Sequence, residues 1–519
     1  MTGEAATVTV AQTQLKPGAL RLPSIFMQSL TMVAPGIAAL FYTPFVVSVA
    51  GLAAPLAYPI AFVIVLITAV VLAELAKAVP GAGGYYNYVA RGINPSAGFV
   101  VSWLNLIYAP LVLGAVTVFG GWVIAGSLGW TGTLADWFPI VFSIVVVSVV
   151  AYIQYLGVQL SGKTLVILGG IELIVVSLLG LWGLANPGPG GLNLKPFDIG
   201  NAKSISGLAL ATVFSIQAFT GWEGAAPMAE ESENPRRNVP RALIGSVILF
   251  GIFIVLVQWG VMIGWGTDNF AAMGTASTLP GITLAQNYWG SLWWILLVML
   301  VSSVCAVSIA CANVSTRMWW RMGQDGAFPK WFGRVDSVRK TPVNAILAQW
   351  VLSILTAIGL TLFAYLFSPA NSDGSAVTIS QAYSNQYYLD GTIIGFVVLI
   401  IYTMGNIAAY MLYRGERRSE FSWWRHLLFP VLSTLGMVVV GLIAIGWIGG
   451  EPLSIGGGTP PAPPYIYGVY LVGIWFVIGL LLAWWLKASG RTGWMKAAAD
   501  GASERPATAE ELEEMKGEW

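Results

Sequence analysis

The segment Val33-Ala34-Pro35-Gly36-Ile37-Ala38 interrupts a long apolar stretch, residues 25–50. A second interruption, Phe219-Thr220-Gly221-Trp222-Glu223, lies inside the apolar stretch 207–230. Proline has no N–H to give to a helix, and glycine weakens a helix interior. We therefore expect residues 34–38 and 217–223 to be non-helical and to face each other. Either break alone also fits ordinary helix packing, as at Gly169-Gly170, so the argument rests on the pair.

The composition places these breaks in a membrane protein. Only 9% of the 519 residues are charged and 56% are apolar, whereas about 25% of the residues in a soluble domain are charged. The two cysteines, Cys305 and Cys311, are too few for a disulfide scaffold. They lie six residues apart on one predicted helix, so we expect neither a disulfide nor a metal site. A net charge of +1 gives no basic field, so no nucleic acid partner is expected.

Apolar runs of about 20 residues recur along nearly the whole chain, and each is long enough to cross a bilayer. The runs are continuous rather than alternating, which excludes membrane strands. We predict an all-α polytopic protein with twelve spans at 25–50, 55–78, 97–128, 136–155, 162–186, 207–230, 241–266, 289–320, 344–367, 391–413, 426–448 and 466–487.

Charge asymmetry predicts the orientation. With the N-terminus inside, all of the 25 Lys and Arg except Lys195 and Lys203 fall on the cytoplasmic side. Residues 1–20 are polar and carry no signal peptide. We therefore expect cytoplasmic tails at 1–24 and 488–519 in a multi-pass protein of the cell membrane. The second tail carries an acidic stretch from Glu510, for which a solvated helix or disorder is the simpler interpretation.

The two interrupted spans are the first and the sixth, so they occupy matching places in two halves of five helices. Because five is odd, the halves run through the membrane in opposite directions. Matching breaks in inverted halves indicate a transporter site near the midplane. The predicted halves are 25–206, spans one to five with the following loop, and 207–413, spans six to ten. Spans eleven and twelve occupy 414–487.

Three motifs resemble those of the amino acid–polyamine–organocation (APC) family of permeases. Ala73-Glu74-Leu75-Ala76 with Pro80-Gly81-Ala82-Gly83-Gly84-Tyr85-Tyr86 follows span two. Glu230-Glu231-Ser232-Glu233-Asn234-Pro235-Arg236-Arg237-Asn238-Val239-Pro240-Arg241 follows the second break. Arg317 leads to Arg321, Asp325-Gly326 and Pro329 after span eight. The resemblance implies the LeuT-type fold, a 5+5 inverted repeat plus two C-terminal helices, and secondary transport of amino acids or amines.

The sequence departs from that family at two places. The family commonly has Gly-Ser-Gly at the first break, whose N–H groups hold a substrate carboxylate, but the matching residues here are Ala34-Pro35-Gly36. Because Pro35 has no N–H, carboxylate binding of the usual kind is in question. The position of a gating aromatic in many relatives is Gln217, so the gate is expected at Phe219 or Trp222, or is looser.

Two carboxylates are expected at membrane depth, where a charge costs roughly 2.5–3.5 kcal/mol. Glu172 stands where many relatives place a lysine that replaces a coupling cation. It is the candidate to bind Na⁺ or to carry a proton; the alternative is a structural glutamate paired with a hydroxyl. Glu223 is a candidate counter-ion for a substrate ammonium or a candidate proton site; the alternative is a cap on the second half-helix. Glu74 is expected at the interface or in a gate.

Uncharged polar residues complete the candidate site. Ser302 and Ser303 are candidates for ion coupling, although hydroxyls also bond to their own helix. Asn105, Tyr108 and Asn313 either line the path or pack, and His426 is expected at the membrane interface. The full substrate-binding set is Ala34, Pro35, Gly36, Ile37, Ala38, Asn105, Tyr108, Gln217, Phe219, Thr220, Gly221, Trp222 and Glu223.

The function that these features predict is secondary active transport of amino acids or related amines, coupled to H⁺ or Na⁺. The alternative is a polyamine or organic-cation transporter or exchanger. No catalytic residues, metal site or cofactor are expected, because the sequence carries no nucleophile elbow, P-loop or histidine-rich set, which argues against an enzyme. A channel would need a repeated filter or a pore helix. The expected partners are a small-molecule substrate and the lipid bilayer.

Overall fold

The computed structural model describes residues 16–274, 279–370, 374–449, 454–455, 463–489 and 492–500. The predicted N-terminal tail is therefore described only from Lys16 onward. Most of the predicted C-terminal tail, including the acidic stretch from Glu510, lies outside the described residues.

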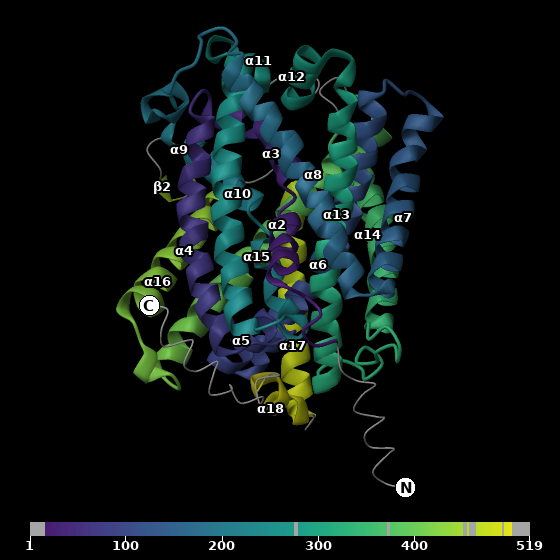
Figure 1. Ribbon diagram of the computed structural model, residues 1–519, viewed down its shortest axis with the longest axis vertical. Coiled ribbons are helices and arrows are strands. Elements are labelled where there is room, and N and C mark those ends of the chain that lie inside the picture. Colours follow the sequence, from purple (N-terminus) through teal and green to yellow (C-terminus); the bar gives the residue numbers. More distant parts are fainter. Residues whose placement is uncertain are drawn as a thin grey trace.

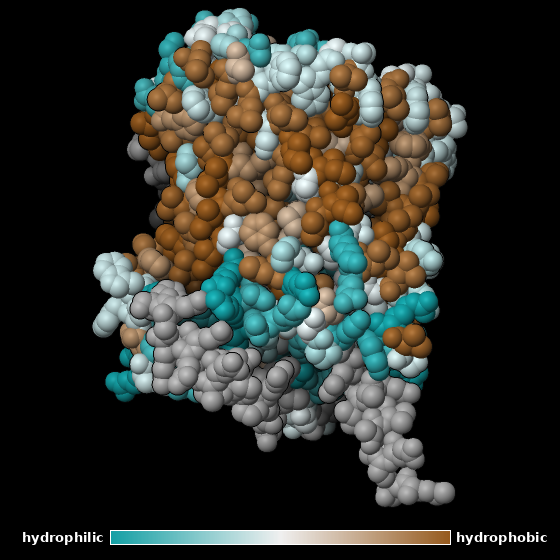
Figure 2. Space-filling model, viewed as in Figure 1, coloured by the Kyte–Doolittle hydropathy of each residue, from teal (hydrophilic) through white to brown (hydrophobic). Residues whose placement is uncertain are grey.

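The molecule is a bundle of long helices that run side by side, with α6 near its centre (Figure 1). In the described part of the chain, eleven helical stretches are long and apolar enough to cross a membrane. Figure 2 shows the apolar band that these helices form between more polar ends. The helices that run unbroken are α4 (Ala57–Ala78), α6 (Pro95–Ser127), α7 (Thr133–Leu156), α8 (Val158–Ala185), α10 (Pro235–Trp265), α13 (Trp294–Asp325), α14 (Val343–Phe367), α15 (Ile379–Arg414), α16 (Phe429–Ala444) and α17 (Tyr465–Ala488).

The first predicted span is made of two helices, α2 (Leu22–Met32) and α3 (Pro35–Ala50). The sixth consists of α9 (Ile205–Ala218) and the 3₁₀ helix η4 (Trp222–Glu231). Neither α9 nor η4 alone is long enough to cross a bilayer, which explains why eleven continuous stretches correspond to twelve predicted spans. The prediction of an all-α membrane protein with two interrupted spans is thus confirmed.

The breaks are shorter than the sequence suggested. Residues 35–38 were expected to be non-helical, but they form the first turn of α3. Proline is well suited to that position, because its missing N–H would have no partner in the first turn anyway. Likewise Gln217 lies in the last turn of α9, which ends at Ala218, and Trp222 and Glu223 begin η4. Only residues 33–34 and 219–221 therefore lie between helices.

Several short elements lie at the ends of the long helices. These are η1 (Ala54–Leu56), α5 (Tyr85–Gly92), η2 (Lys195–Phe197), η3 (Ile199–Asn201), η5 (Thr267–Asn269), α11 (Phe270–Gly274), α12 (Pro280–Trp289), η6 (Gly290–Leu292), η7 (Arg418–Glu420), η8 (Trp424–Leu428), β1 (Ile448–Gly449), β2 (Ser454–Ile455) and α18 (Gly493–Asp500). The two strands pair antiparallel.

The tenth span begins much earlier than predicted. We expected it at 391–413, but α15 starts at Ile379, after a capping box formed by Thr378 and Gln381. The first part of α15 contains several polar side chains that lowered its hydropathy and hid it from a search for apolar runs. This extension moves Asp390 from a predicted loop into the body of the helix.

Candidate functional site

The two helix breaks lie against each other. Ala34 has a φ of 53° and Gly221 a φ of 112°, so the backbone is in the left-handed region at both breaks. A Cβ atom on Gly221 would stand 2.6 Å from the carbonyl oxygen of Met32, which explains why glycine is needed. Just beyond, the backbone N–H of Ala225 donates to Ser29 Oγ across 2.9 Å. The predicted juxtaposition of the breaks is therefore present in the structure.

A cavity of about 80 Å³ opens beside the breaks. Its wall combines both breaks with the facing surfaces of α6, α13 and α15. The lining residues are Met32, Val33, Ala34, Ile37, Ala38, Tyr42, Tyr108, Val112, Val116, Gln217, Ala218, Thr220, Val307, Tyr387, Asp390, Gly391 and Ile394. The cavity is thus lined by elements of both predicted halves.

Only part of the predicted substrate-binding set lines this cavity: Ala34, Ile37, Ala38, Tyr108, Gln217 and Thr220. The remaining members, Pro35, Gly36, Asn105, Phe219, Gly221, Trp222 and Glu223, are not among its lining residues. The reason is the helical conformation of residues 35–38, which the sequence analysis did not predict. Once residues 35–38 form a helical turn, alternate faces of that turn point to different neighbours.

The aromatic side chains of the second break do not form the gate expected there. The Phe219 ring packs between Phe62 and Phe250, with ring centroids 6.2 and 4.7 Å away. Trp222 lies 5.7 Å from Tyr402. Both rings therefore fill the interior behind the break and stay outside the cavity wall.

A different aromatic group lies next to the cavity. Phe41 of α3 stands 4.1 Å from Phe119 of α6 and 4.5 Å from Tyr387 of α15, measured between ring centroids. Tyr387 itself lines the cavity. Three helices are thus joined by one aromatic cluster, which the sequence analysis missed because its members are far apart in the chain.

Gln217 connects α9 to α15. Its Nε2 donates to the backbone carbonyl of Gly391. A Cβ atom on Gly391 would stand 3.2 Å from that nitrogen, so the absence of a side chain permits the approach. Gln217 therefore positions the end of α9 against α15 beside the cavity.

Asp390 is a cavity residue that the sequence analysis did not identify. Its side chain is 3% exposed, and its Oδ1 atom has no hydrogen-bond partner among the described residues. The available signal was the polar run Ser384-Asn385-Gln386 with Tyr387-Tyr388, which resembles a loop by composition. Within a helix, the same residues place an acidic side chain on the cavity wall.

Glu172 lies where α3, α8 and α13 meet. Its Oε1 atom accepts the backbone N–H of Gly36 at 2.5 Å and the hydroxyl of Ser303 at 2.6 Å. The side chain is completely buried, and Oε2 has no hydrogen-bond partner in the described part of the chain. The carboxylate therefore stands at the N-terminal end of α3, where a helix favours negative charge.

The two neighbouring serines of α13 have different partners. Ser303 donates to Glu172, whereas Ser302 donates to the carbonyl of Leu168 across 2.9 Å. The two hydroxyls thus separate into one that contacts the buried carboxylate and one that holds the backbone of α8.

Glu223 holds the second break together. Its Oε2 atom accepts the Tyr402 hydroxyl at 2.6 Å and the Gly221 N–H at 3.1 Å. Both contacts are internal to the protein, as a helix cap requires. Its alternative role as a substrate counter-ion stays a prediction.

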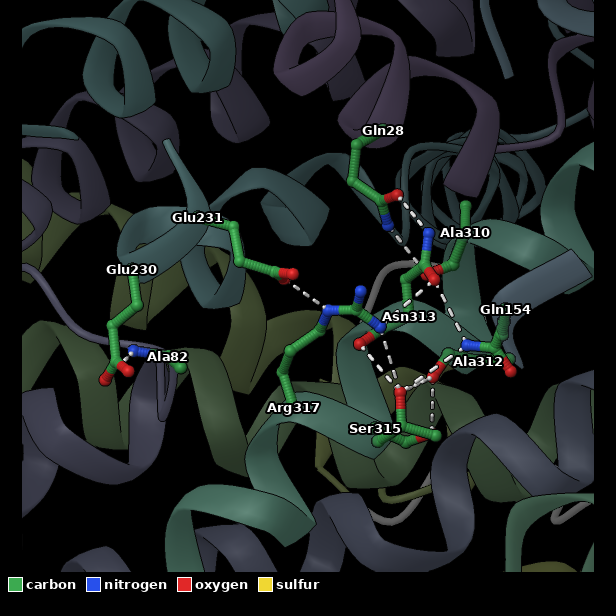
Figure 3. A network of polar contacts seen from close by, with 11 residues as sticks. Gln28, Ala82, Gln154, Glu230, Glu231, Ala310, Ala312, Asn313, Ser315 and Arg317 are labelled. Carbon is green, nitrogen blue, oxygen red and sulfur yellow. Dashed lines mark hydrogen bonds and ion pairs between the residues drawn. The ribbon is translucent and has the colours of Figure 1, made fainter. Parts of the chain in front are cut away.

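A buried polar network holds α2 and η4, which are each one part of a broken span (Figure 3). Arg317 Nε lies 2.7 Å from Glu231 Oε2, and both side chains are 1% exposed. Arg317 also donates to Asn313, whose Nδ2 donates to Gln28 Oε1 at 3.1 Å. Gln154 of α7 donates to Asn313 as well. Asn313 is therefore a hub between helices and not a cavity residue.

Glu74 marks one end of α4. Its carboxylate lies 3.4 Å from Lys77 Nζ, 3.4 Å from Arg425 and 3.5 Å from His426 Nε2. The His426 ring stacks on Tyr413 at 3.6 Å. These groups form a charged cluster at the helix ends, away from the cavity. Cys305 and Cys311 are free thiols.

Comparison with known proteins gives the same family as the motifs in the sequence. Residues 20–490 match the family model described as amino acid permease. An uncharacterized transporter of Legionella pneumophila is 26% identical over 80% of this chain and 84% of its own length. The serine/threonine exchanger SteT of Bacillus subtilis is 24% identical over 72% of this chain and 78% of its own length. The low-affinity putrescine importer PlaP of Escherichia coli is 25% identical over 56% of this chain and 64% of its own length.

The interrupted helices, the cavity between them and a family match over nearly the whole chain agree with one another. They confirm the resemblance noted from the motifs after spans two, six and eight. The chain is a multi-pass membrane protein, and it belongs to the amino acid permease family.

Proposed function

We propose that the protein is a secondary active transporter that carries an amino acid or a related amine by alternating access. The observation that carries this proposal is the cavity at two adjacent helix breaks, whose wall contains residues of both predicted halves. A substrate in such a cavity contacts both halves, and a movement of one half against the other exposes it to either side. The similarity to SteT, a serine/threonine exchanger, and to PlaP, a putrescine importer, supports a small amino acid or amine as the substrate.

The coupling cation would act at Glu172. Its carboxylate joins the N-terminus of α3 to α8 and α13, and its Oε2 atom is available to hold a proton or a Na⁺ ion. Binding of a positive charge there changes the charge at the junction of three helices. A ligand can shift a conformational equilibrium only through such a difference between the two states.

The orientation belongs to the same proposal. Lys203 donates its backbone N–H to Ala50 at the end of α3, whereas Leu20, just before α2, pairs with Glu231 at the other end of the span. Lys203, one of the two lysines expected outside, thus lies at the end of the span that is opposite to the start of α2. Because Lys and Arg concentrate on the cytoplasmic side, both termini are cytoplasmic and the protein lies in the cell membrane.

The test uses purified full-length protein in proteoliposomes with radiolabelled amino acids and amines. Accumulation against a substrate gradient, driven by an imposed H⁺ or Na⁺ gradient, is the expected result. Equilibration without accumulation under every imposed gradient contradicts cation coupling and leaves exchange or facilitated diffusion. Absence of any protein-dependent flux contradicts the transport proposal itself.

A second candidate is an organic-cation or polyamine transporter or exchanger. One observation favours it: the charged side chain among the lining residues is that of Asp390, which is acidic.

A further inference from the structure

Asp390 presents an unpaired carboxylate to the cavity. It lines the wall, the residue is 3% exposed, and its Oδ1 atom has no hydrogen-bond partner among the described residues. The side-chain amide among the lining residues is already engaged, since Gln217 Nε2 donates to the carbonyl of Gly391. The protein therefore leaves this carboxylate without a partner of its own.

An unpaired carboxylate in a protein interior is unfavourable because it has lost its water without gaining a hydrogen bond or a counter-ion. Proteins keep such a group where a ligand completes the pairing. Here the group adjoins a space rather than packed side chains, so a partner of opposite charge has room to enter.

The remaining wall also favours a cation. Among the lining residues there is no Lys, Arg or His, so a substrate carboxylate would meet no positive charge. Tyr42, Tyr108 and Tyr387 contribute hydroxyls and aromatic faces, which attract ammonium groups. The two breaks add the backbone of Val33 and Thr220, which lies between helices.

Part of the place where a substrate carboxylate would bind a helix terminus is already occupied. Pro35 has no N–H, and the N–H of Gly36 donates to Glu172. The protein thus supplies its own carboxylate to the N-terminal end of α3. A carboxylate on the substrate would compete with Glu172 for the same donor.

We propose that Asp390 is the counter-ion for the ammonium group of the substrate, so that the cavity recognises a small organic amine and does not require a substrate carboxylate. This assignment rests on the proposed transport function and names its substrate class. The cavity of about 80 Å³ is smaller than the roughly 150 Å³ that holds benzene, which favours a small group beside Asp390.

The first test needs only the wild-type protein. Ethylamine is L-alanine without its carboxylate, and propionate is L-alanine without its ammonium group, so each of the two lacks one of the charged groups of the parent. Each is added to the purified full-length chain, and the melting temperature is measured, because a ligand that binds the folded state raises it. Ethylamine and L-alanine should raise the melting temperature, and propionate should not. A shift with propionate equal to that with ethylamine overturns the proposal.

The second test replaces the carboxylate by a neutral group of the same shape, Asp390→Asn. Loss of a charge-assisted hydrogen bond should weaken ethylamine binding about ten- to a hundredfold. Asp136→Asn in α7 removes a carboxylate away from the cavity and is the matched control, with wild-type affinity expected. Asp390→Glu keeps the charge and should retain more affinity than Asp390→Asn.

A purely structural role for Asp390 makes a different prediction. The ligand-free Asp390→Asn protein should melt at or above the wild-type temperature, since the change removes an unpaired buried acidic group. A structural role requires a lower melting temperature with unchanged ligand affinity, and that result overturns the proposal. So does a result in which Glu223→Gln, and not Asp390→Asn, abolishes the preference for ethylamine over propionate.

Two further outcomes separate this proposal from others. If NaCl alone, compared with choline chloride, gives a melting shift that Asp390→Asn removes, Asp390 is an inorganic-cation site and the amine assignment fails. If wild-type proteoliposomes transport labelled substrate and Asp390→Asn proteoliposomes do so with the same affinity, the assignment fails while the transport function stands. Failure of the transport function itself appears instead as absence of flux in the wild-type protein.

Discussion

The backbone N–H of Gly36 donates to Oε1 of Glu172 across 2.5 Å, although the two residues belong to spans one and five. A Cβ atom on Gly36 would stand 2.5 Å from Met299 Sδ and 3.1 Å from Glu172 Cγ. The close approach of α3 to α8 therefore depends on the absence of a side chain at this residue.

Gly36→Ala should disrupt that contact and reduce gradient-driven accumulation at least tenfold, because Met299 and Glu172 must move apart to admit the methyl group. Gly170→Ala is the matched control, since a Cβ atom there meets no described atom within 4 Å. Uptake in proteoliposomes and the melting temperature of both variants check this. Equal loss in both variants would mean that glycine flexibility, and not the contact with Glu172, is what matters.

Glu172→Gln should abolish cation-driven accumulation while substrate binding is partly retained. The amide can still accept from Gly36 and Ser303, but it can neither take up a proton nor neutralise Na⁺ at the former Oε2. Counterflow of labelled substrate under zero gradient measures the retained binding. A variant that still concentrates substrate on the wild-type gradient would make Glu172 a structural residue.

The two serines of α13 provide a finer comparison. Ser303→Ala removes a donor to the buried carboxylate and should change the cation dependence of uptake by roughly tenfold, the effect of a charge-assisted hydrogen bond. Ser302→Ala removes a hydroxyl that donates to Leu168 and should leave that dependence within about twofold. The measurement is the half-maximal cation concentration for uptake. Identical shifts in the two variants would contradict the assignment.

Arg317→Met should destabilise the protein by about 3–5 kcal/mol, because it leaves the Glu231 carboxylate buried and unpaired. The double variant Arg317→Met with Glu231→Leu removes both charges and should recover most of the lost melting temperature. Thermal unfolding in detergent measures both. If the double variant is no more stable than the single one, the hydrogen bonds to Asn313 carry the stability instead.

The loop after α15 offers a pH-dependent contact. A hydrogen bond from Arg91, partly opposed by burial, holds the pKa of Glu416 below its usual value of 4.5. Because the folded-state pKa is lowered, the contact stabilises the protein at pH values above 4.5, and that stability is lost as the pH falls through the lower folded-state pKa. The side chain of Glu416 is 48% exposed, so the contribution is small.

Arg91→Gln should therefore lower the melting temperature slightly at about pH 7 and leave it unchanged once Glu416 is protonated in both proteins. The pH dependence of the difference between the two proteins is the informative quantity. A difference that persists unchanged at acid pH would assign the effect to lost packing of the arginine stem.

The sequence by itself determined the fold class and the presence of the two breaks, and it singled out Glu172 as a candidate. Hydropathy over about 20 residues, a missing proline N–H and the cost of a carboxylate in lipid are local properties, and they do not depend on which helices meet. The match of residues 20–490 to the amino acid permease family agrees with that local argument.

Only the tertiary structure decided which side chains face the cavity. The extent of the first turn of α3 turned Pro35 and Gly36 away from it, and the early start of α15 brought Asp390 into its wall. The contact between Gly36 and Glu172 and the pairing of Glu231 with Arg317 join residues distant in the chain. Such contacts follow from the packing of whole helices, which no local pattern of residues specifies.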